Sequence, residues 1–422
     1  MFNRVKGTQD FLDLTLFNFF ISSIKKHLGN YNFTEIKTPI LEPTELFKRS
    51  LGTDTDVVTK EMYTVNTGPD SESICLRPED TAAIVRAFVN NGIQQTPWKV
   101  FEWGPMFRHE RPQKGRYREF YQVSIEIIGS NSVSQDAHFI KMLDRLFTEV
   151  LAIDSAALLI NFLGCAQDRS NFKVIIKEFL ESIEHGICAT CTERKGKNVM
   201  RVYDCKNPVC QDLYQQAPAI ADYLCADCTH EWTTLKHTLE ALSVSYSYAP
   251  RLVRGLDYYG KVVFEFVSLA LGAQNAFCGG GRYNQLVKDV GSKEDQPSIG
   301  AAIGIERVLL ILETQKDKLN FTRALPLHVI VPFGTEQHAL ALLLADELQA
   351  SHMRTDILLE GESLKSMMRT ANKLEAQYVL LIGPDEQAQR VVTVKNMVSG
   401  TEERIAHADL VRYLLAAHAA NK

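Results

Sequence analysis

The feature that most constrains the fold of this chain is a pair of strand-like runs that flank a charged loop. The runs are KVFEWGPMF at 99–107 and REFYQVSIEII at 118–128, and both are rich in aromatic and β-branched residues. Such residues favour strands. Between the runs lies the polar segment RHERPQKGRY, which contains both proline and glycine. Two strands joined in this way predict an antiparallel hairpin with an unusually long, charged connection.

The order of the remaining elements divides the chain into two domains. Helical patterns at 136–150 and 172–184 are followed by a stretch rich in cysteine and helix formers, and strand character returns at 261–268. We therefore predict a domain of mixed helices and strands over residues 1–320. A helical, cysteine-rich insertion is expected within it at about 165–249.

The last hundred residues have a different pattern. Short apolar strands such as LHVIVPF and QYVLLIG alternate with segments of helical spacing. This alternation predicts a small, mostly parallel α/β domain over residues 325–422. The polar stretch 316–325, just ahead of Pro326, marks the expected boundary.

Charge and hydropathy exclude some classes of protein. The formal net charge of −5 is not that of a general nucleic-acid binder, so any RNA contact must use local basic patches. The N-terminus shows no basic start followed by a long apolar run, and no window approaches the roughly 20 apolar residues that span a bilayer. We expect a cytoplasmic protein with no membrane partner.

The predicted hairpin loop concentrates basic side chains. Arg108, Arg111, Lys114, Arg116 and Arg118 lie close together, with an acidic residue among them. Guanidinium groups bind phosphate oxygens in pairs, and an aromatic on the returning strand offers a stacking surface for a base. A solvated charge run at a hairpin tip is the common alternative. These residues alone leave the two interpretations open.

The full spelling of the segment favours the phosphate site. FRHERPQKGRYREFYQ, from Phe107 to Gln122, resembles motif 2 of class II aminoacyl-tRNA synthetases in its histidyl form. RGLDYYGKVVFEF from Arg254 and FCGGGRYNQLV from Phe277 resemble the two histidine-specific peptides of that family. GAAIGIER, ending at Arg307, resembles motif 3.

Three further segments near the N-terminus agree with the same resemblance. They are KGTQD at 6–10, TPILEPTELFKRSLG at 38–52, which is similar to the dimer-forming motif 1, and LRPEDTA at 76–82. The resemblance covers nearly the whole chain. It implies an α+β domain with the class II synthetase fold, built on a six- or seven-stranded antiparallel sheet over residues 1–320, and a C-terminal anticodon-binding α/β domain.

The resemblance implies a set of ATP-binding residues. Arg108 would contact the α-phosphate and the histidine carboxylate, and Glu110 would orient the adenine edge. Phe120 and Arg307 would sandwich the adenine ring, while Arg116 and Arg307 would hold the outer phosphates. Magnesium is expected to accompany ATP, since the sequence shows no dedicated cage of protein ligands for it.

Arg254 is the second catalytic residue that the resemblance implies, besides Arg108. It would approach the α-phosphate from the side opposite Arg108. Fixed cations aimed at the phosphorus lower the barrier to attack by a carboxylate. The alternative for Arg254 is a surface ion pair with Asp257, which would contribute little.

The histidine substrate needs an anion for its ammonium group and polar partners for both ring nitrogens. By resemblance Glu79, Thr81 and Gln122 would contact the α-amino group. Glu126 and Tyr259 would contact the ring, with Tyr258 beside them. The alternative for the two tyrosines is a pair of aromatics in the core.

Two positions depart from the family pattern. Asp80, which we include among the histidine-binding residues, stands where many relatives have glycine, so the loop beside Glu79 is less defined. Asn284 stands where aspartate is usual, which weakens any charge pairing there.

The function that the resemblance implies is the ATP-dependent ligation of L-histidine to tRNA(His). The reaction would pass through a histidyl-adenylate and end on the 3′-terminal adenosine of the tRNA. Motif 1 implies a homodimer with Pro39 near the interface. The alternative is a synthetase-like regulatory paralogue of histidine biosynthesis without ligase activity. Such paralogues generally lack the C-terminal domain and lose the motif arginines.

The cysteines raise a separate question. Six of the nine lie between 188 and 228, in the order Cys188, Cys191, Cys205, Cys210, Cys225 and Cys228. Thiolate pairs at such spacing can hold a structural zinc ion. Unligated thiols that pack small helices are the alternative, which we favour here. We therefore assign no metal ligand from the sequence.

Overall fold

A computed structural model describes residues 2–66, 68, 72–272, 275–319, 325–360 and 363–420. The chain forms two compact units, Met1–Leu319 and Asn320–Lys422. Residues 320–324, which are half of the predicted boundary at 316–325, lie outside the described residues. Among the described residues, no helix is both long and apolar enough to cross a membrane.

The first unit is built on an eight-stranded sheet in the order β1-β5-β6-β11-β10-β9-β7-β8. The six central strands are antiparallel neighbours, whereas the two end pairs, β1 with β5 and β7 with β8, are parallel. The strands are β1 (Thr34–Glu35), β5 (Trp98–Phe107), β6 (Glu119–Ile128), β7 (Ala156–Phe162), β8 (Ser247–Tyr248), β9 (Gly260–Ser268), β10 (Ala276–Arg282) and β11 (Ser298–Gly304).

The predicted antiparallel sheet is confirmed, but the expected six or seven strands were too few. β1 and β8 are only two residues long and exposed. A strand that short has no room for the alternation of apolar and polar residues by which strands are detected. These two edge strands therefore leave no signal in the sequence.

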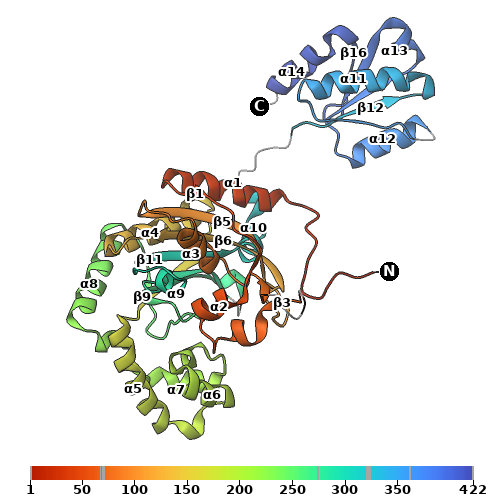
Figure 1. Cartoon of the computed structure of the whole chain (residues 1–422). Coiled ribbons are helices and arrows are strands. Elements are labelled where there is room, and N and C mark those ends of the chain that lie inside the picture. Colours follow the sequence, from red (N-terminus) through yellow and green to blue (C-terminus); the bar gives the residue numbers. More distant parts are fainter. Residues whose placement is uncertain are drawn as a thin grey trace. The chain divides into compact units, whose positions relative to one another are not determined.

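Helices and a small second sheet surround the large sheet (Figure 1). Helix α10 packs against β6 and α1, and α3 also contacts β6. The helices outside the insertion are α1 (Thr15–Asn30), α2 (Thr44–Leu51), α3 (Thr81–Asn90), α4 (Val133–Arg145), α9 (Leu286–Asp289) and α10 (Ile305–Glu313). The small sheet has the order β2-β4-β3, with strands β2 (Leu41–Pro43), β3 (Tyr63–Val65) and β4 (Ile74–Leu76).

The predicted hairpin is formed by β5 and β6, which pair along their whole length from Trp98↔Ile128 to Phe107↔Glu119. The loop continues the pairing, because the backbone N–H of Arg108 donates to the carbonyl of Arg118 at 2.9 Å. It closes in a tight turn at Gly115, whose φ of 74° is the left-handed conformation that glycine adopts readily. The charged loop is therefore an ordered extension of the hairpin.

The region predicted as an insertion is mainly helical. In Figure 1 its first part, in yellow-green, projects below the sheet, whereas its last helix, α8 (Ala226–Ala241), lies at the left beside the sheet. Its other helices are α5 (Ala166–Ser182), α6 (Ala189–Lys197) and α7 (Pro208–Leu213). Phe172, Ile176 and Leu180 of α5 pack in one apolar cluster with Val253 and Tyr259, which lie ahead of β9. The insertion thus shares a core with the segment that leads into β9.

The second unit has a five-stranded sheet in the order β13-β12-β14-β15-β16. Only the β12–β13 and β12–β14 pairs are parallel, so the predicted mostly parallel sheet is half antiparallel. Strand β16, EERIA, is mostly exposed and charged, and its composition gives no strand signal. The elements are β12 (His328–Pro332), α11 (His338–Ala350), β13 (Thr355–Ile357), α12 (Leu364–Lys373), β14 (Tyr378–Ile382), α13 (Pro384–Gln389), β15 (Val391–Asn396), β16 (Glu402–Ala406) and α14 (Leu410–Ala420).

Candidate active site

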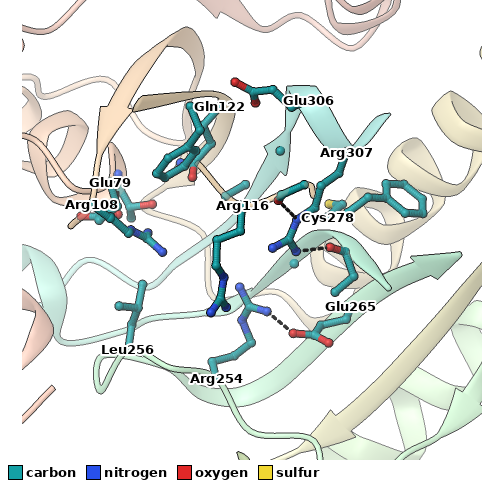
Figure 2. Close-up of a pocket in the computed structure, with 18 of the residues that line it drawn as sticks. Glu79, Arg108, Arg116, Gln122, Arg254, Leu256, Glu265, Cys278, Glu306 and Arg307 are labelled. Carbon is teal, nitrogen blue, oxygen red and sulfur yellow. Dashed lines mark hydrogen bonds and ion pairs between the residues drawn. The ribbon is translucent and has the colours of Figure 1, made fainter. Parts of the chain in front are cut away.

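A cavity in the first unit collects most of the residues that the motifs predict. It is formed by the β5–β6 hairpin, by β9, β10 and β11, and by the start of α10 (Figure 2). The empty space within it is about 950 Å³ and is open to solvent. The predicted residues that line it are Glu79, Thr81, Arg108, Glu110, Arg116, Phe120, Gln122, Arg254, Tyr258, Tyr259 and Arg307.

Arg108 is held at one side of the cavity at the point where β5 ends. Its Nε donates to the carbonyl of Pro78 at 2.8 Å, and its guanidinium carbon lies 5.3 Å from the centre of the Phe120 ring. Arg116 extends into the same cavity from the hairpin loop and pairs with Glu110, Nε to Oε2, at 2.7 Å. The hairpin therefore delivers two guanidinium groups and an aromatic face to one space.

Arg254 enters from a different part of the chain, the segment before β9. Its Nη1 pairs with Glu265 on β9 at 2.5 Å, and its side chain is only 20% exposed. Burial opposes the charge, but the Glu265 carboxylate raises the pKa of Arg254 overall. The alternative ion pair with Asp257 is wrong, because the Asp257 carboxylate accepts from Asn198 at 2.7 Å instead.

Gly279 on β10 makes room for this arginine. Gly279 and Glu265 are direct partners in the sheet, and a Cβ at position 279 would collide with the Arg254 guanidinium. Glycine thus allows the side chain to lie close over the sheet.

Arg307 reaches the cavity from the first turn of α10. Its Nε donates to the carbonyl of Gly115 at 3.0 Å and its Nη1 to that of Ala276. Burial, and then the nearby charge of Arg116, lower the pKa of Arg307. Four arginines from three separated segments therefore line one cavity, an arrangement that suits a polyanion such as a triphosphate.

The opposite charge is supplied by Glu79 at the N-terminus of α3. Its two carboxylate oxygens accept the backbone N–H groups of Thr81 and Ala82, each at 2.9 Å. Burial raises the pKa of Glu79, and these two hydrogen bonds counter the effect. A carboxylate fixed in this way can receive an ammonium group.

Glu126 lies one layer behind the cavity and does not line it. It is fully buried, and it accepts hydrogen bonds from the hydroxyls of Thr81 at 2.7 Å and Tyr283 at 2.5 Å. Burial raises the pKa of Glu126 well above its usual range. Since Thr81 lines the cavity, Glu126 is linked to it through that hydroxyl.

For Tyr258 and Tyr259 the sequence left two roles open, a place in the substrate site and a place in the apolar core. They line the cavity, and they also belong to the apolar cluster shared with the insertion. Their ring centres lie 4.5 Å apart, and the Arg254 guanidinium carbon lies 5.6 Å from the Tyr259 ring centre.

Asp80 is not among the residues that line the cavity. Its Oδ1 accepts from Arg77 Nη1 at 2.8 Å, and the same nitrogen donates to Glu102 at 2.8 Å. All three side chains are almost completely buried. We predicted that Asp80 contacts histidine, but its carboxylate is already engaged in a buried ion pair.

The second departure, Asn284, lies beside another buried ion pair. Its amide oxygen accepts from Arg282 at 3.4 Å, while Arg282 pairs with Asp136. Asparagine therefore keeps an acceptor at this position without a second negative charge.

Lining residues that were not predicted include Glu265, Cys278 and Glu306. Glu265 is the only acidic residue in the strand GKVVFEFVS. A single carboxylate in a mostly apolar strand is a signal that could have found it. Cys278 and Glu306 lie within the quoted motifs, but nothing in their own chemistry singled them out.

Comparisons with known proteins agree with this geometry. Residues 63–316 match the family described as the tRNA synthetase class II core domain (G, H, P, S and T), and residues 328–417 match the anticodon binding domain family. A histidine–tRNA ligase of Solidesulfovibrio magneticus is 39% identical over 420 residues, which cover 98% of this chain and 97% of the relative. The chain belongs to the histidyl-tRNA synthetase family.

Other members are similarly close. A histidine–tRNA ligase of Halothermothrix orenii is 41% identical over 384 residues, or 90% of each chain. The crystal structure of the apo S. aureus histidyl-tRNA synthetase has a TM-score of 0.80 and 31% identity, and the match covers 98% of this chain and 99% of that one. Family membership therefore extends over both units, as the resemblance implied.

Glu306 gives the site of this family member a titratable group near neutrality. The carboxylate accepts the backbone N–H of Tyr121 at 2.8 Å, and burial raises its pKa to about 7. Because the folded-state pKa lies above the unfolded value, the ionised group destabilises the fold. That cost is absent below about pH 4.5 and grows as the pH rises to about 7.

We expect Glu306→Gln to be more stable than the parent chain above pH 7, by up to about 3 kcal/mol, with no difference near pH 4.5. Thermal unfolding midpoints across this pH range measure the effect. Glu313→Gln, in the exposed last turn of the same helix, is the matched control and should follow the parent curve. Parallel curves for the parent and Glu306→Gln would contradict the shifted pKa.

Proposed function

We propose that this protein joins L-histidine to tRNA(His) at the expense of ATP. The observation that supports this most strongly is the meeting of Arg108 and Arg254 in one cavity, since they come from segments far apart in the sequence. In the proposed first step a carboxylate oxygen of histidine attacks the α-phosphorus of ATP and pyrophosphate leaves. The two guanidinium groups stabilise the charge that develops on the α-phosphate oxygens.

The other cavity residues fit the two substrates of this step. Phe120 offers a face for the adenine, while Arg116 and Arg307 are placed for the outer phosphates. Glu79 would receive the ammonium group of histidine. Thr81 and Gln122 would contact the same ammonium group, and Glu126 and Tyr259 would read the imidazole ring, with Tyr258 beside them. Amino acids whose side chains leave these buried polar groups without partners would be rejected.

Magnesium is proposed to arrive bound to the phosphates of ATP. Glu110 and Glu265 already pair with Arg116 and Arg254, and Glu79 is held by backbone N–H groups. These carboxylates do not form a preassembled magnesium cage. When bound, the ion would neutralise charge on the outer phosphates.

In the second step a hydroxyl of the 3′-terminal adenosine attacks the carbonyl carbon of the adenylate, and AMP leaves. The second unit would bind the anticodon, in line with the match of residues 328–417 to the anticodon binding domain. We further propose a cytoplasmic homodimer that assembles through the segment around Pro39.

The proposal is tested by amino-acid-dependent exchange of pyrophosphate into ATP, with each of the twenty amino acids. Exchange is expected with histidine alone, followed by charging of tRNA(His) when the tRNA is supplied. A protein that binds histidine without any exchange would instead be the regulatory paralogue. The presence of the C-terminal unit and of all four cavity arginines supports the ligase.

A further inference from the structure

The cysteines of the insertion form clusters that the sequence spacing did not reveal. All nine cysteines are free thiols. Among the described residues, eight side chains form two groups whose ligand atoms lie within 4.8 Å of one another. The first quartet is Cys188, Cys191, Cys205 and Cys210, and the second quartet is Cys165, Asp168, Cys225 and Cys228.

The six cysteines that lie close in the sequence, from Cys188 to Cys228, do not form one group in the structure. Cys225 and Cys228 lie with Cys165 and Asp168 at the start of α5, away from the other four cysteines. Neither quartet lines the active-site cavity. The quartets are therefore separate from the candidate active site.

The first quartet has the dimensions of a tetrahedral metal site. The sulfurs of Cys188 and Cys205 are 3.8 Å apart. Four sulfurs at about 2.3 Å from a zinc ion are about 3.8 Å from one another, whereas a disulfide needs about 2.05 Å. Three of the four cysteines are buried, so the sulfurs face one another in a closed space.

Backbone N–H groups are already directed at these sulfurs. The N–H of Cys188 donates to Cys210 Sγ at 3.2 Å, and that of Asn207 donates to Cys205 Sγ at 3.4 Å. Such donors stabilise a thiolate, which is the form that binds a metal.

In both quartets, several of the candidate ligands lie at the N-terminus of a helix. Cys188 is the N-cap of α6, Cys225 that of α8 and Cys165 that of α5, and the third residue of each helix is the next ligand. The N-cap and third positions lie on the same side of a helix end. The partial positive charge of that end favours a thiolate or carboxylate.

Asp168 ties the second quartet together. Its two oxygens accept the N–H of Cys165 at 3.1 Å and that of Cys225 at 3.0 Å. A carboxylate has about four acceptor positions, so two remain for a metal ion. The second quartet thus joins the start of the insertion, at α5, to the start of its last helix, α8.

We propose that the insertion holds two structural zinc ions, one on each quartet. Four thiolates, or three thiolates with one carboxylate, are donor sets that zinc takes in tetrahedral geometry, with all positions filled by protein. The first ion would fix the short helices α6 and α7 to each other, and the second would close the base of the insertion. The insertion then supports the Arg254 segment through contacts such as Asn198 with Asp257.

The metal content of the full-length protein, purified without chelators, tests the proposal. Two zinc ions per chain are expected. The double variants Cys188→Ser/Cys205→Ser and Cys225→Ser/Cys228→Ser should each retain one ion. Cys75→Ser, at a buried cysteine in β4 outside both quartets, is the matched control and should retain two.

Well under one zinc ion per chain, iron in its place, or zinc unchanged in both double variants would overturn the proposal. A single ion lost with only one quartet would support that site and refute the other. If the variants do not fold, the parent chain can be titrated with a mercurial thiol reagent. Zinc release in step with thiol modification supports the proposal, and modification without release of zinc refutes it.

Discussion

Arg254→Ala is expected to lower kcat/KM for histidine-dependent pyrophosphate exchange about 100- to 1000-fold, which is about 2.7–4 kcal/mol of transition-state stabilisation. In the proposed mechanism this guanidinium stabilises the α-phosphate as the pentavalent arrangement forms. Its fixed pairing with Glu265 orients it before any ligand arrives. A donor that needs no reorganisation at the moment of reaction contributes most to the rate.

Two further variants sharpen this prediction. Arg251→Ala removes an arginine of the same segment that donates to Gln211 in the insertion and does not line the cavity, so exchange should stay near the parent level. Arg254→Lys keeps the charge but loses the planar fork, and should recover only part of the activity. A folded Arg254→Ala protein with robust exchange would refute the catalytic role.

The second large effect concerns stability. Arg77→Met is expected to destabilise the first unit by about 3–5 kcal/mol. Arg77 Nη1 pairs with Asp80 and Glu102 at 2.8 Å each, and the two carboxylates are completely buried. Removing the arginine leaves two buried carboxyl groups without their counterion and hydrogen-bond donor, which costs far more than the pair contributes by itself.

Thermal unfolding of the full chain measures the shift. Arg145→Met is the matched control, because Arg145 pairs with Glu149 at 3.0 Å with both side chains about half exposed. It should cost less than about 1 kcal/mol. A similar loss in the two variants would show that the buried ion pairs do not carry the stability assigned to them.

Much of the fold could be predicted from local patterns. The β5–β6 hairpin follows from two runs of strand-forming residues, and both units follow from the change in element order. The short parallel edge strands β1 and β8 could not be found, because two residues are too few for a periodic pattern. The charged edge strand β16 was missed because it has no apolar face of its own. Only its pairing with β15 places it in the sheet.

The sequence predicted which residues form the cavity better than it predicted how they are arranged in space. Motif resemblance named the arginines, and the structure brings them together. The sequence could not show that Glu126 lies behind Thr81. The alternation along a strand tells which face of the sheet a side chain lies on, but not how far it lies from the cavity. The partner of Arg254 was also out of reach, since Asp257 is near in sequence but Glu265 is near in space.

The second cysteine quartet also contains residues that are distant in the sequence and close in space, which a sequence pattern could not reveal. Spacing suggested neighbours along the chain, such as Cys225 with Cys228. The start of α5 lies beside the start of α8, which adds Cys165 and Asp168 from far earlier in the sequence. Only the fold brings these ligands together.

The measurement that tests the central claim most directly is a crystal structure with histidine and a non-hydrolysable ATP analogue. The α-phosphate oxygens are predicted to lie within hydrogen-bonding distance of both Arg108 and Arg254, which approach from opposite sides. A nucleotide bound in another cavity, or an α-phosphate that contacts only one of the two guanidinium groups, would contradict the proposed mechanism.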